Sequence, residues 1–214
     1  MVLKTVTRKK ARTNQHKTSN HVKGKQGKNA NSLRIIGGDW RSRKLAFIDA
    51  PGLRPTPDRI RETLFNWLQG RVHGAYCIDM FAGSGALGFE ALSRGAKELV
   101  FVEKNAACVH QLKENLTLLK ADSTVLQCDA LAFLSKIPTP KKPFDLVFLD
   151  PPYRQDLVPK SLHYLQNEGL LNENSLIYLE HESEEKYNWE DFGLNILKEA
   201  KAGQVHSFLL SKNA

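Results

Sequence analysis

Short apolar segments alternate with helical patterns along most of the chain after residue 75. Runs with strand-like composition cover 76–81, 98–102, 124–127, 144–149 and 175–179. Apolar residues at helical spacing cover 86–94, about 105–119, a short segment after 129, and about 157–165. This alternation is typical of an α/β fold, a parallel sheet with helices on both faces. Segments 194–198 and 205–210, on either side of Gly203, indicate a final antiparallel pair.

Two smaller elements are expected before this alternation. Leu33–Ile36 and Lys44–Ile48 flank a Gly37-Gly38 pair, which predicts a short hairpin. Thr56-Pro57-Asp58 predicts a helix start, with Thr56 as the cap and Pro57 at the first helical position. The helix has an apolar face at 60, 64, 65 and 68, and Arg59, Arg61 and Glu62 are expected largely off that face. We divide the chain into a tail (1–30), an extension (31–71) and an α/β domain (72–214).

Charge is spread unevenly over the 214 residues, whose net charge is +8. Residues 1–30 carry nine Lys and Arg and no Asp or Glu, and almost nothing large and apolar. Such a segment cannot offset its ordering entropy by burial, so we expect it to be disordered. A basic arm of this kind gains affinity for nucleic-acid phosphates by releasing counterions, whereas a solubilising tail is the simpler interpretation. Because the following segment is also basic, we favour nucleic-acid binding.

Several classes of protein are disfavoured by composition. The three cysteines form no CxxC pair and the seven histidines are scattered, so we expect neither a disulfide framework nor a metal site. No apolar run approaches the roughly 18 residues that a membrane span needs. The N-terminus lacks the apolar region of a secretory signal. These features together predict a protein of the reducing cytoplasm.

A glycine-rich turn follows the first predicted strand of the α/β domain. Gly83, Gly85 and Gly88 match G-x-G-x-x-G, and Glu103 ends the next strand, where an acid suits a ribose diol. The pattern alone fits a nicotinamide dinucleotide, S-adenosylmethionine (SAM) or merely tight packing in the turn. Asp79 favours SAM, because a carboxylate near the turn attracts an ammonium group and repels a pyrophosphate. Asp129 could accept from an adenine amine or cap the next helix.

The segment Asp150-Pro151-Pro152-Tyr153 follows the most apolar predicted strand. Its two prolines make a stiff turn without N–H donors, so the backbone there presents carbonyl acceptors. Asp150 adds a carboxylate and Tyr153 an aromatic ring. Acceptors beside a stacking surface suit the exocyclic amine of a nucleobase, and in-line methyl transfer would then depend mainly on positioning and charge placement. A rigid loop with a buried tyrosine is the alternative.

The segment Asp150–Tyr153 resembles the motif of class I SAM-dependent methyltransferases that act on exocyclic amines. A closer resemblance rests on Arg34–Gly38, Arg41, Arg43–Leu45, Pro51–Thr56, Asp58–Leu68, Asp79–Gly88 and Glu90–Gly95. In these segments the chain resembles the RsmD family, bacterial 16S rRNA (guanine-N2) methyltransferases. The resemblance extends from about residue 33 to the end, and the Lys-rich tail is longer than this family leads us to expect.

The resemblance implies a Rossmann-like fold, with a seven-stranded, mostly parallel sheet, helices on both faces and a small N-terminal β-hairpin. It implies that residues 72–214 transfer the methyl group of SAM to N2 of a guanine in 16S rRNA, expected to be guanine 966. The partners would be 16S rRNA and the small ribosomal subunit or its assembly intermediate, bound by a monomer.

The resemblance also implies roles for individual residues. Those expected to be catalytic are Asp150, Pro151, Pro152 and Tyr153. Those expected to contact SAM are Asp79, Phe81, Gly83, Gly85, Glu103, Lys104, Asp129, Ala130, Thr56 and Arg61. The stretch 56–62 would cover the methionine end of SAM, with Arg61 or Arg59 facing its carboxylate. Those expected to bind RNA are Arg34, Arg41, Arg43, Lys44, Arg54 and Arg59.

Three other functions are compatible with parts of the pattern. Adenine-N6 methylation of DNA or RNA would use the same Asp-Pro-Pro-Tyr chemistry. A non-catalytic RNA-binding assembly factor could retain the fold, although the intact glycines, Glu103 and Asp150-Pro-Pro-Tyr argue against the loss of catalytic function. An NAD-dependent oxidoreductase would share the glycine turn but lacks an evident proton donor. His181 is expected to be a surface residue at a strand end, and Trp40 either stacks on RNA or anchors the hairpin.

Overall fold

The computed structural model describes residues 31–48, 55–136, 142–167 and 169–213. The predicted basic tail and Arg54 lie outside the described residues. Within the described part of the chain, no helix has the length and apolar character needed to cross a membrane.

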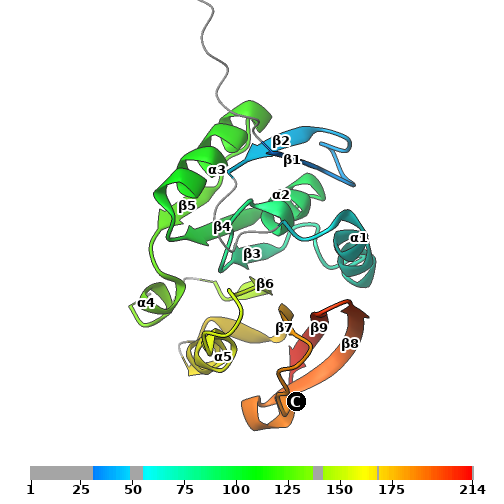
Figure 1. Cartoon of the computed structure of the whole chain (residues 1–214), viewed down its shortest axis with the longest axis vertical. Coiled ribbons are helices and arrows are strands. Elements are labelled where there is room, and N and C mark those ends of the chain that lie inside the picture. Colours follow the sequence, from blue (N-terminus) through cyan, green and yellow to red (C-terminus); the bar gives the residue numbers. More distant parts are fainter. Residues whose placement is uncertain (1–30, 49–54, 137–141, 168, 214) are drawn as a thin grey trace, which may run out of the picture.

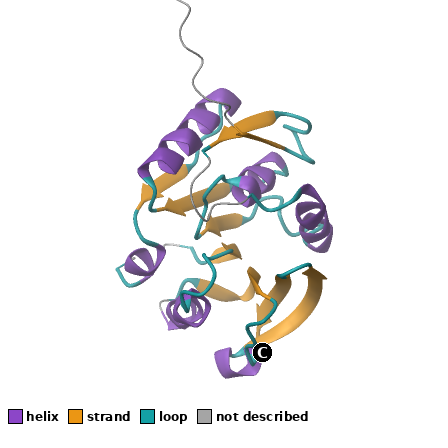
Figure 2. Ribbon diagram, viewed as in Figure 1, coloured by secondary structure: helices purple, strands orange, loops and turns teal. Residues whose placement is uncertain are grey.

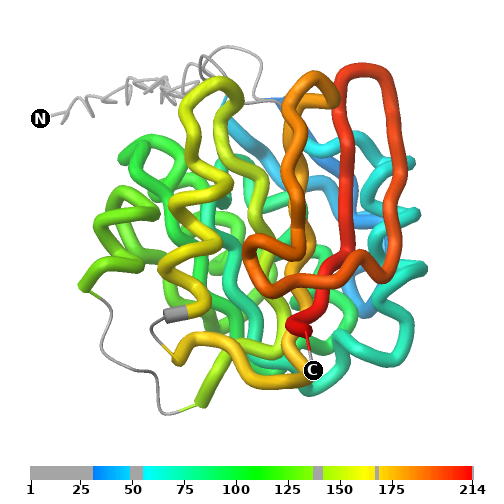
Figure 3. The backbone as a smooth tube through the Cα atoms, turned by 90° about the horizontal axis from the view of Figure 1, so that it is seen from below, coloured from blue at the N-terminus to red at the C-terminus, as the bar shows by residue number. Residues whose placement is uncertain are grey.

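A seven-stranded sheet forms the centre of the molecule (Figure 1). Its strands are β3 (Tyr76–Asp79), β4 (Glu98–Glu103), β5 (Thr124–Gln127), β6 (Phe144–Leu149), β7 (Leu171–Glu182), β8 (Leu194–Ala202) and β9 (Val205–Lys212). They are ordered β5-β4-β3-β6-β7-β9-β8. The first five are parallel, and β9 is antiparallel to both β7 and β8. Figure 3 shows the β8–β9 pair at one edge of the molecule.

Helices cover both faces of this sheet (Figure 2). One face carries α1 (Asp58–Trp67), α2 (Ala86–Ser93) and α3 (Ala106–Leu119), and the other carries α4 (Ala130–Leu134), α5 (Leu157–Asn167) and the short 3-10 helix η1 (Trp189–Phe192). The predicted class I α/β architecture is therefore confirmed. The sequence pattern did not predict η1, and β7 is longer at both ends than the predicted strand 175–179.

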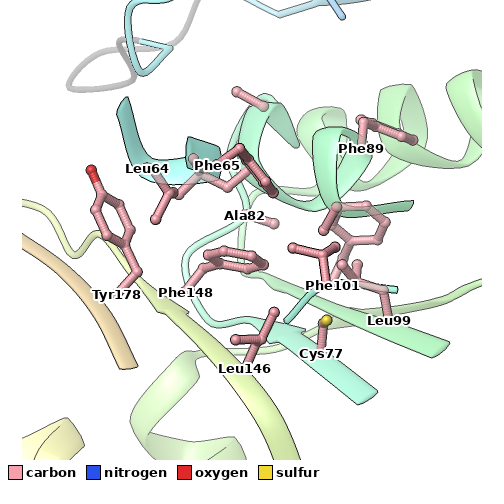
Figure 4. Packing of buried hydrophobic residues seen from close by; sticks show 14 of the residues in the cluster. Leu64, Phe65, Cys77, Ala82, Phe89, Leu99, Phe101, Leu146, Phe148 and Tyr178 are labelled. Atoms are coloured by element: carbon pink, nitrogen blue, oxygen red, sulfur yellow. The ribbon is translucent and has the colours of Figure 1, made fainter. Parts of the chain in front are cut away.

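Alternation along the strands divides the apolar residues between two cores. Phe101, Phe148 and Tyr178 point to the α1–α2–α3 face, and Ile78 and Leu149 point to the other. Figure 4 shows Phe148 and Tyr178 packed near Leu64 and Phe65 of α1. Successive residues of a strand face opposite sides of the sheet. A polar residue two positions beyond one of these core residues therefore lies on the same face of the sheet as that core residue.

The predicted hairpin is present as β1 (Asn31–Arg34) and β2 (Lys44–Phe47). It is attached to α2 through Glu90, which is fully buried and accepts hydrogen bonds from the backbone N–H groups of Ile36 and Gly37, both at 2.8 Å. A Cβ at Gly38 would lie 1.8 Å from the Ser93 carbonyl oxygen, so only glycine allows this close approach. Trp40 packs partly buried against the same core, in agreement with an anchoring role.

Two expectations for α1 are wrong. Pro57, not Thr56, is the N-cap, and no side chain caps this end, because proline has no polar side chain; its carbonyl accepts from the N–H groups of Ile60 and Arg61. Arg61 was expected largely off the buried face, yet only 1% of it is exposed. Its guanidinium lies 2.6 Å from Asp58 and 3.5 Å from buried Glu90, and these anions offset the cost of burying its charge.

Candidate active site

The glycine turn between β3 and α2 has the backbone conformation that its residues predict. Gly83 and Gly85 have positive φ values of 51° and 76°, which other residues rarely adopt. Gly88 serves packing, since a Cβ there would lie 2.2 Å from Cε1 of Phe101 on β4. The turn therefore presents its backbone at the carboxyl edge of the sheet, the edge where α/β folds bind their ligands.

Glu103, at the end of β4, holds this turn in place. One carboxylate oxygen accepts from the Gly83 N–H at 2.8 Å, and the other accepts from the Asn105 N–H at 2.7 Å. The side chain is only partly buried, so its remaining lone pairs face the ligand edge. The structure thus brings Gly83, Gly85 and Glu103 together, as the sequence predicted.

Asp79 ends β3 and is almost fully buried, with 3% exposed. Its carboxylate accepts one hydrogen bond, from the Gly88 N–H at 3.2 Å. Burial raises the pKa of Asp79 to about 7; the Gly88 hydrogen bond lowers it and the charge of Glu103 raises it further. Among the described residues, no cation forms an ion pair with this buried carboxylate, so a positively charged ligand group would stabilise it.

The other residues predicted to contact the cofactor surround this edge. Asp129 is exposed and caps α4, accepting from the N–H groups of Leu131 and Ala132 through one oxygen. Ala130 is buried, Phe81 partly buried and Lys104 exposed. The capping role of Asp129 is confirmed, and its predicted contact with an adenine amine stays a prediction.

Asp150, Pro151, Pro152 and Tyr153 directly follow β6. Pro151 is buried and Pro152 half-buried, whereas Tyr153 is 38% exposed. Burial, with the nearby charges of Glu180 and Asp79, raises the pKa of Asp150 well above its usual range. The motif therefore places a partly buried carboxylate with a raised pKa at the same edge as Asp79 and the glycine turn.

The structure adds two residues that the sequence did not single out, Tyr178 and Glu180 on β7. Leu149 of β6 pairs with Leu179 of β7, so Asp150 and Glu180 are the next residues in register and share a face. Glu180 is 3% exposed and accepts a hydrogen bond from the Tyr178 hydroxyl at 2.5 Å. Burial raises the pKa of Glu180 to about 6, against the lowering effect of that hydrogen bond. The available signal was an acid, Glu180, directly after the apolar run 176–179 of a predicted strand.

His181 is buried, with 2% exposed, so its expected surface position is wrong. Its ring stacks on Phe208 at 5.4 Å and meets Tyr187 edge-on at 5.1 Å. Burial lowers its pKa. A cavity of about 10 Å³, the space of a single water, lies between His181 and the loop after Asp150. The prediction is wrong because the sequence pattern did not predict η1 or the segment before it, whose Trp189 and Tyr187 rings cover His181.

The residues predicted to bind RNA differ in their surroundings. Arg41, Arg43, Lys44 and Arg59 are exposed. Arg34 is exposed but pairs with Asp58 at 3.1 Å, and Arg54 lies outside the described residues. Arg61, predicted to face a cofactor carboxylate, is instead bonded to the carbonyls of Thr56 and Arg34 as well as to its acidic partners. Its contact with a cofactor stays a prediction.

The site as a whole is a row of carboxylates at one sheet edge, of which Asp79 and Glu180 are buried and Asp150 is partly buried. Asp79, Asp150 and Glu180 lie on one face of three neighbouring strands, beside the glycine turn. Such a row favours a ligand that carries positive charge and donates hydrogen bonds. In the described part of the chain, no group of three or more His, Cys, Asp or Glu has the arrangement of a metal site.

The strand order, the glycine turn and the Asp-Pro-Pro-Tyr segment together define a class I methyltransferase. Comparison with known proteins agrees. A family model described as "Conserved hypothetical protein 95" matches residues 33–211. Ribosomal RNA small subunit methyltransferase D of Escherichia coli K12 is 45% identical over 183 residues, 85% of this chain and 91% of that protein. The chain therefore belongs to the RsmD family of methyltransferases.

Two further relatives cover nearly the same part of the chain. The protein of the same name from Haemophilus influenzae is 45% identical over 188 residues, 85% of this chain and 94% of its own length. The solved structure of the Escherichia coli protein yhhF superposes with a TM-score of 0.76 at 44% identity, covering 86% of this chain and 99% of that one. The resemblance inferred from sequence motifs is thereby confirmed.

Proposed function

We propose that this protein transfers the methyl group of SAM to the exocyclic N2 of a guanine in 16S rRNA. Family membership supports an rRNA substrate, because the relatives bear the name ribosomal RNA small subunit methyltransferase D. The observation that carries the proposal is the partly buried Asp150 carboxylate, followed by two prolines and placed beside Asp79 and Glu180. Guanine 966 is the expected target by family resemblance.

The residues of the ligand edge suit SAM. Asp79 offers a buried carboxylate to the ammonium of the methionine part, and Glu103 offers acceptors to the ribose hydroxyls. The positive φ of Gly83 and Gly85 lets the backbone approach the ligand without a Cβ in the way. When bound, SAM supplies an activated methyl group on a sulfonium, so the protein needs to position rather than activate the donor.

Asp150 and the Pro151 carbonyl would hold the target amine. Both are acceptors, and together they can bind the two N–H donors of an exocyclic amine, which aims the nitrogen lone pair at the methyl group. Tyr153 offers a ring for stacking against the base. A carboxylate with a raised pKa also suits the proton that the amine must lose, with Glu180 and Tyr178 hydrogen-bonded behind it.

The basic face of the extension would bind the rRNA backbone. Arg41, Arg43, Lys44 and Arg59 are exposed there, and the Lys-rich residues 1–30 would add counterion release. The substrate would then be 16S rRNA, or the small subunit during assembly, in the bacterial cytoplasm. We infer a monomer that uses no metal.

The test offers methyl-labelled SAM in parallel to unmethylated small subunits, naked 16S rRNA and DNA. Nucleosides from the labelled product are then identified by mass spectrometry. We expect N2-methylguanosine from rRNA. Asp150→Ala should abolish transfer yet bind SAM in calorimetry as the wild type does, and Asp156→Ala, three residues beyond the motif, should transfer normally. Normal turnover by Asp150→Ala would remove this residue from the mechanism.

Adenine-N6 methylation is the second candidate, since Asp150 and Pro151 would hold an adenine amine equally well. N6-methyladenosine as the sole product of the same experiment would replace our proposal. Absence of SAM binding would instead favour a non-catalytic assembly factor. Family membership argues against the oxidoreductase.

A further inference from the structure

A second cavity lies beside the active site, between α1 and the outer strands of the sheet. Its volume is about 270 Å³, close to the lower end of the roughly 300–1,000 Å³ typical of ligand pockets. Figure 1 shows α1 next to one end of the β8–β9 pair. The cavity is lined by Arg59, Ile60, Thr63, Trp67, Tyr178, Ala200, Lys201, Ala202 and Ser207.

The lining combines apolar walls with positive charge. Ile60, Thr63 and Trp67 form one stripe of α1 at helical spacing, and each is only partly buried. Opposite them, the small side chains of Ala200 and Ala202 leave the hollow open. Arg59 and Lys201 are exposed, and none of the residues that line the cavity is acidic.

This chemistry fits one nucleotide of a single strand. A base needs apolar or aromatic surfaces for its two faces, and its phosphate needs cations nearby. Trp67 and Ile60 offer the surface, and Arg59 and Lys201 offer the charge. A peptide segment would more commonly require polar groups for its backbone, whereas the hydroxyl of Tyr178 is already directed to Glu180.

The position of the cavity relates it to the methylation site. Tyr178 lines it and lies two residues before Glu180 on β7, which corresponds to roughly 7 Å along the strand. Asp150 neighbours Glu180 but does not line the cavity. An occupant would therefore lie beside the target base rather than in its place, about as far away as the next nucleotide of an extended chain.

We propose that this cavity binds a nucleotide adjacent to the methylated base in the substrate RNA, with Trp67 contacting its base and Arg59 and Lys201 its phosphate. The proposal rests on the proposed function, whose RNA substrate it makes more specific. It assigns substrate selection to α1 and to the β8–β9 end, in addition to the exposed arginines of the hairpin.

The experiment compares two cavity variants with a matched control in the full-length protein. Lys201→Ala removes charge at the cavity, and Lys198→Ala removes the same charge from an exposed site on the same strand outside it. Ala202→Phe fills the hollow, and thermal unfolding checks that the variant is folded. Steady-state kinetics use naked 16S rRNA and, in parallel, unmethylated small subunits, and calorimetry measures SAM binding separately.

For Ala202→Phe, we expect KM for RNA to rise roughly 5- to 100-fold, the factor lost with one stacked base. SAM affinity should not change. Lys201→Ala should weaken RNA binding and reduce its salt dependence by about one phosphate contact, whereas Lys198→Ala should match the wild type. Wild-type KM and salt dependence in both cavity variants would overturn the proposal. So would a defect seen only with assembled subunits, because that result would indicate a protein partner.

A cross-linking experiment separates failure of this proposal from failure of the proposed function. 16S rRNA containing 4-thiouridine is irradiated with the protein, and the cross-linked peptides are mapped by mass spectrometry. We expect cross-links to α1 or to residues 200–202, lost in Ala202→Phe. If RNA is methylated but never cross-links there, only the cavity proposal fails. If methylation is absent yet these cross-links form, the cavity binds RNA and only the proposed activity fails.

Discussion

Glu180 provides a sharp test of the buried carboxylate row. Replacement by Gln preserves the shape of the side chain and an oxygen that can accept the Tyr178 hydroxyl, 2.5 Å away. The substitution removes the ability to ionise and exchanges one carboxylate oxygen for an NH2 group, an exchange that acts equally at every pH. Because Glu180 is 3% exposed, solvent screens this charge weakly. The pH-dependent part of any change in stability should therefore report the cost of ionising a carboxyl group at this position.

The sign and size follow from the pKa of Glu180, which burial raises from 4.5 to about 6 in the folded protein. Below pH 4.5 both folded and unfolded chains hold the proton, so the carboxyl costs nothing. Between these values the unfolded chain ionises first, and the folded protein loses stability as pH rises. A pKa difference of about 1.5 corresponds to about 2 kcal/mol. At pH 8 we expect Glu180→Gln to be more stable than the wild type by about this amount.

The assay is urea denaturation of both proteins from pH 4 to pH 8 without SAM. Glu173→Gln, an exposed site on the same strand, serves as the control and should show no such pH-dependent gain. The acidic limb of the pH–rate profile should also move to lower pH in Glu180→Gln, because the Glu180 charge helps to raise the pKa of Asp150. A stability difference that is independent of pH, or a destabilised variant at pH 8, would refute this reasoning.

Three further substitutions test other parts of the structure. Arg61→Met leaves the fully buried Glu90 without one of its cations, so urea denaturation should show a loss of about 3–5 kcal/mol; calorimetry on the folded variant then tests the predicted contact of Arg61 with SAM. Gly88→Ala places a Cβ 2.2 Å from Phe101 and should cost about 1–3 kcal/mol, despite the better helix propensity of Ala; an unchanged melting temperature would contradict this packing. Glu103→Gln sets an amide donor against backbone N–H donors and should weaken SAM binding about tenfold or more in calorimetry, so wild-type affinity would argue against its role.

Much of the fold could be predicted because its signals are local. The alternation of apolar strands with amphipathic helices reflects which faces each element buries. Short stretches of sequence are enough to show this pattern. The glycine turn is equally local, since positive φ at Gly83 and Gly85 is a property of those residues. The carboxyl ends of parallel strands meet at one edge, so Glu103 and Asp150, at or after the ends of predicted strands, could be assigned to a common site. Asp79, inside the predicted strand 76–81, could be added because it lies near the glycine turn.

Other features depend on contacts between distant segments. Arg61 is charged and was expected to lie largely off the apolar face of its helix. Its burial is possible because Glu90 of α2, distant in sequence, lies beside its guanidinium. His181 is covered by rings from η1 and β9, elements whose packing no local pattern reveals. The helix cap lies one residue later than expected because the helical backbone begins after Pro57, and proline has no polar side chain to cap the helix.

Local patterns in the chain are enough to predict the strand–helix order, the conformation of the glycine turn and the chemistry available at the carboxyl edge of the sheet. Long-range packing places Glu180 beside Asp150, and makes α1 and the β8–β9 pair enclose a cavity lined by Trp67 and Lys201. The two sets of features differ because backbone preference acts over only a few residues. Neighbourhood between strands, desolvation of a carboxylate and the shape of a cavity arise only when separate segments exclude water together.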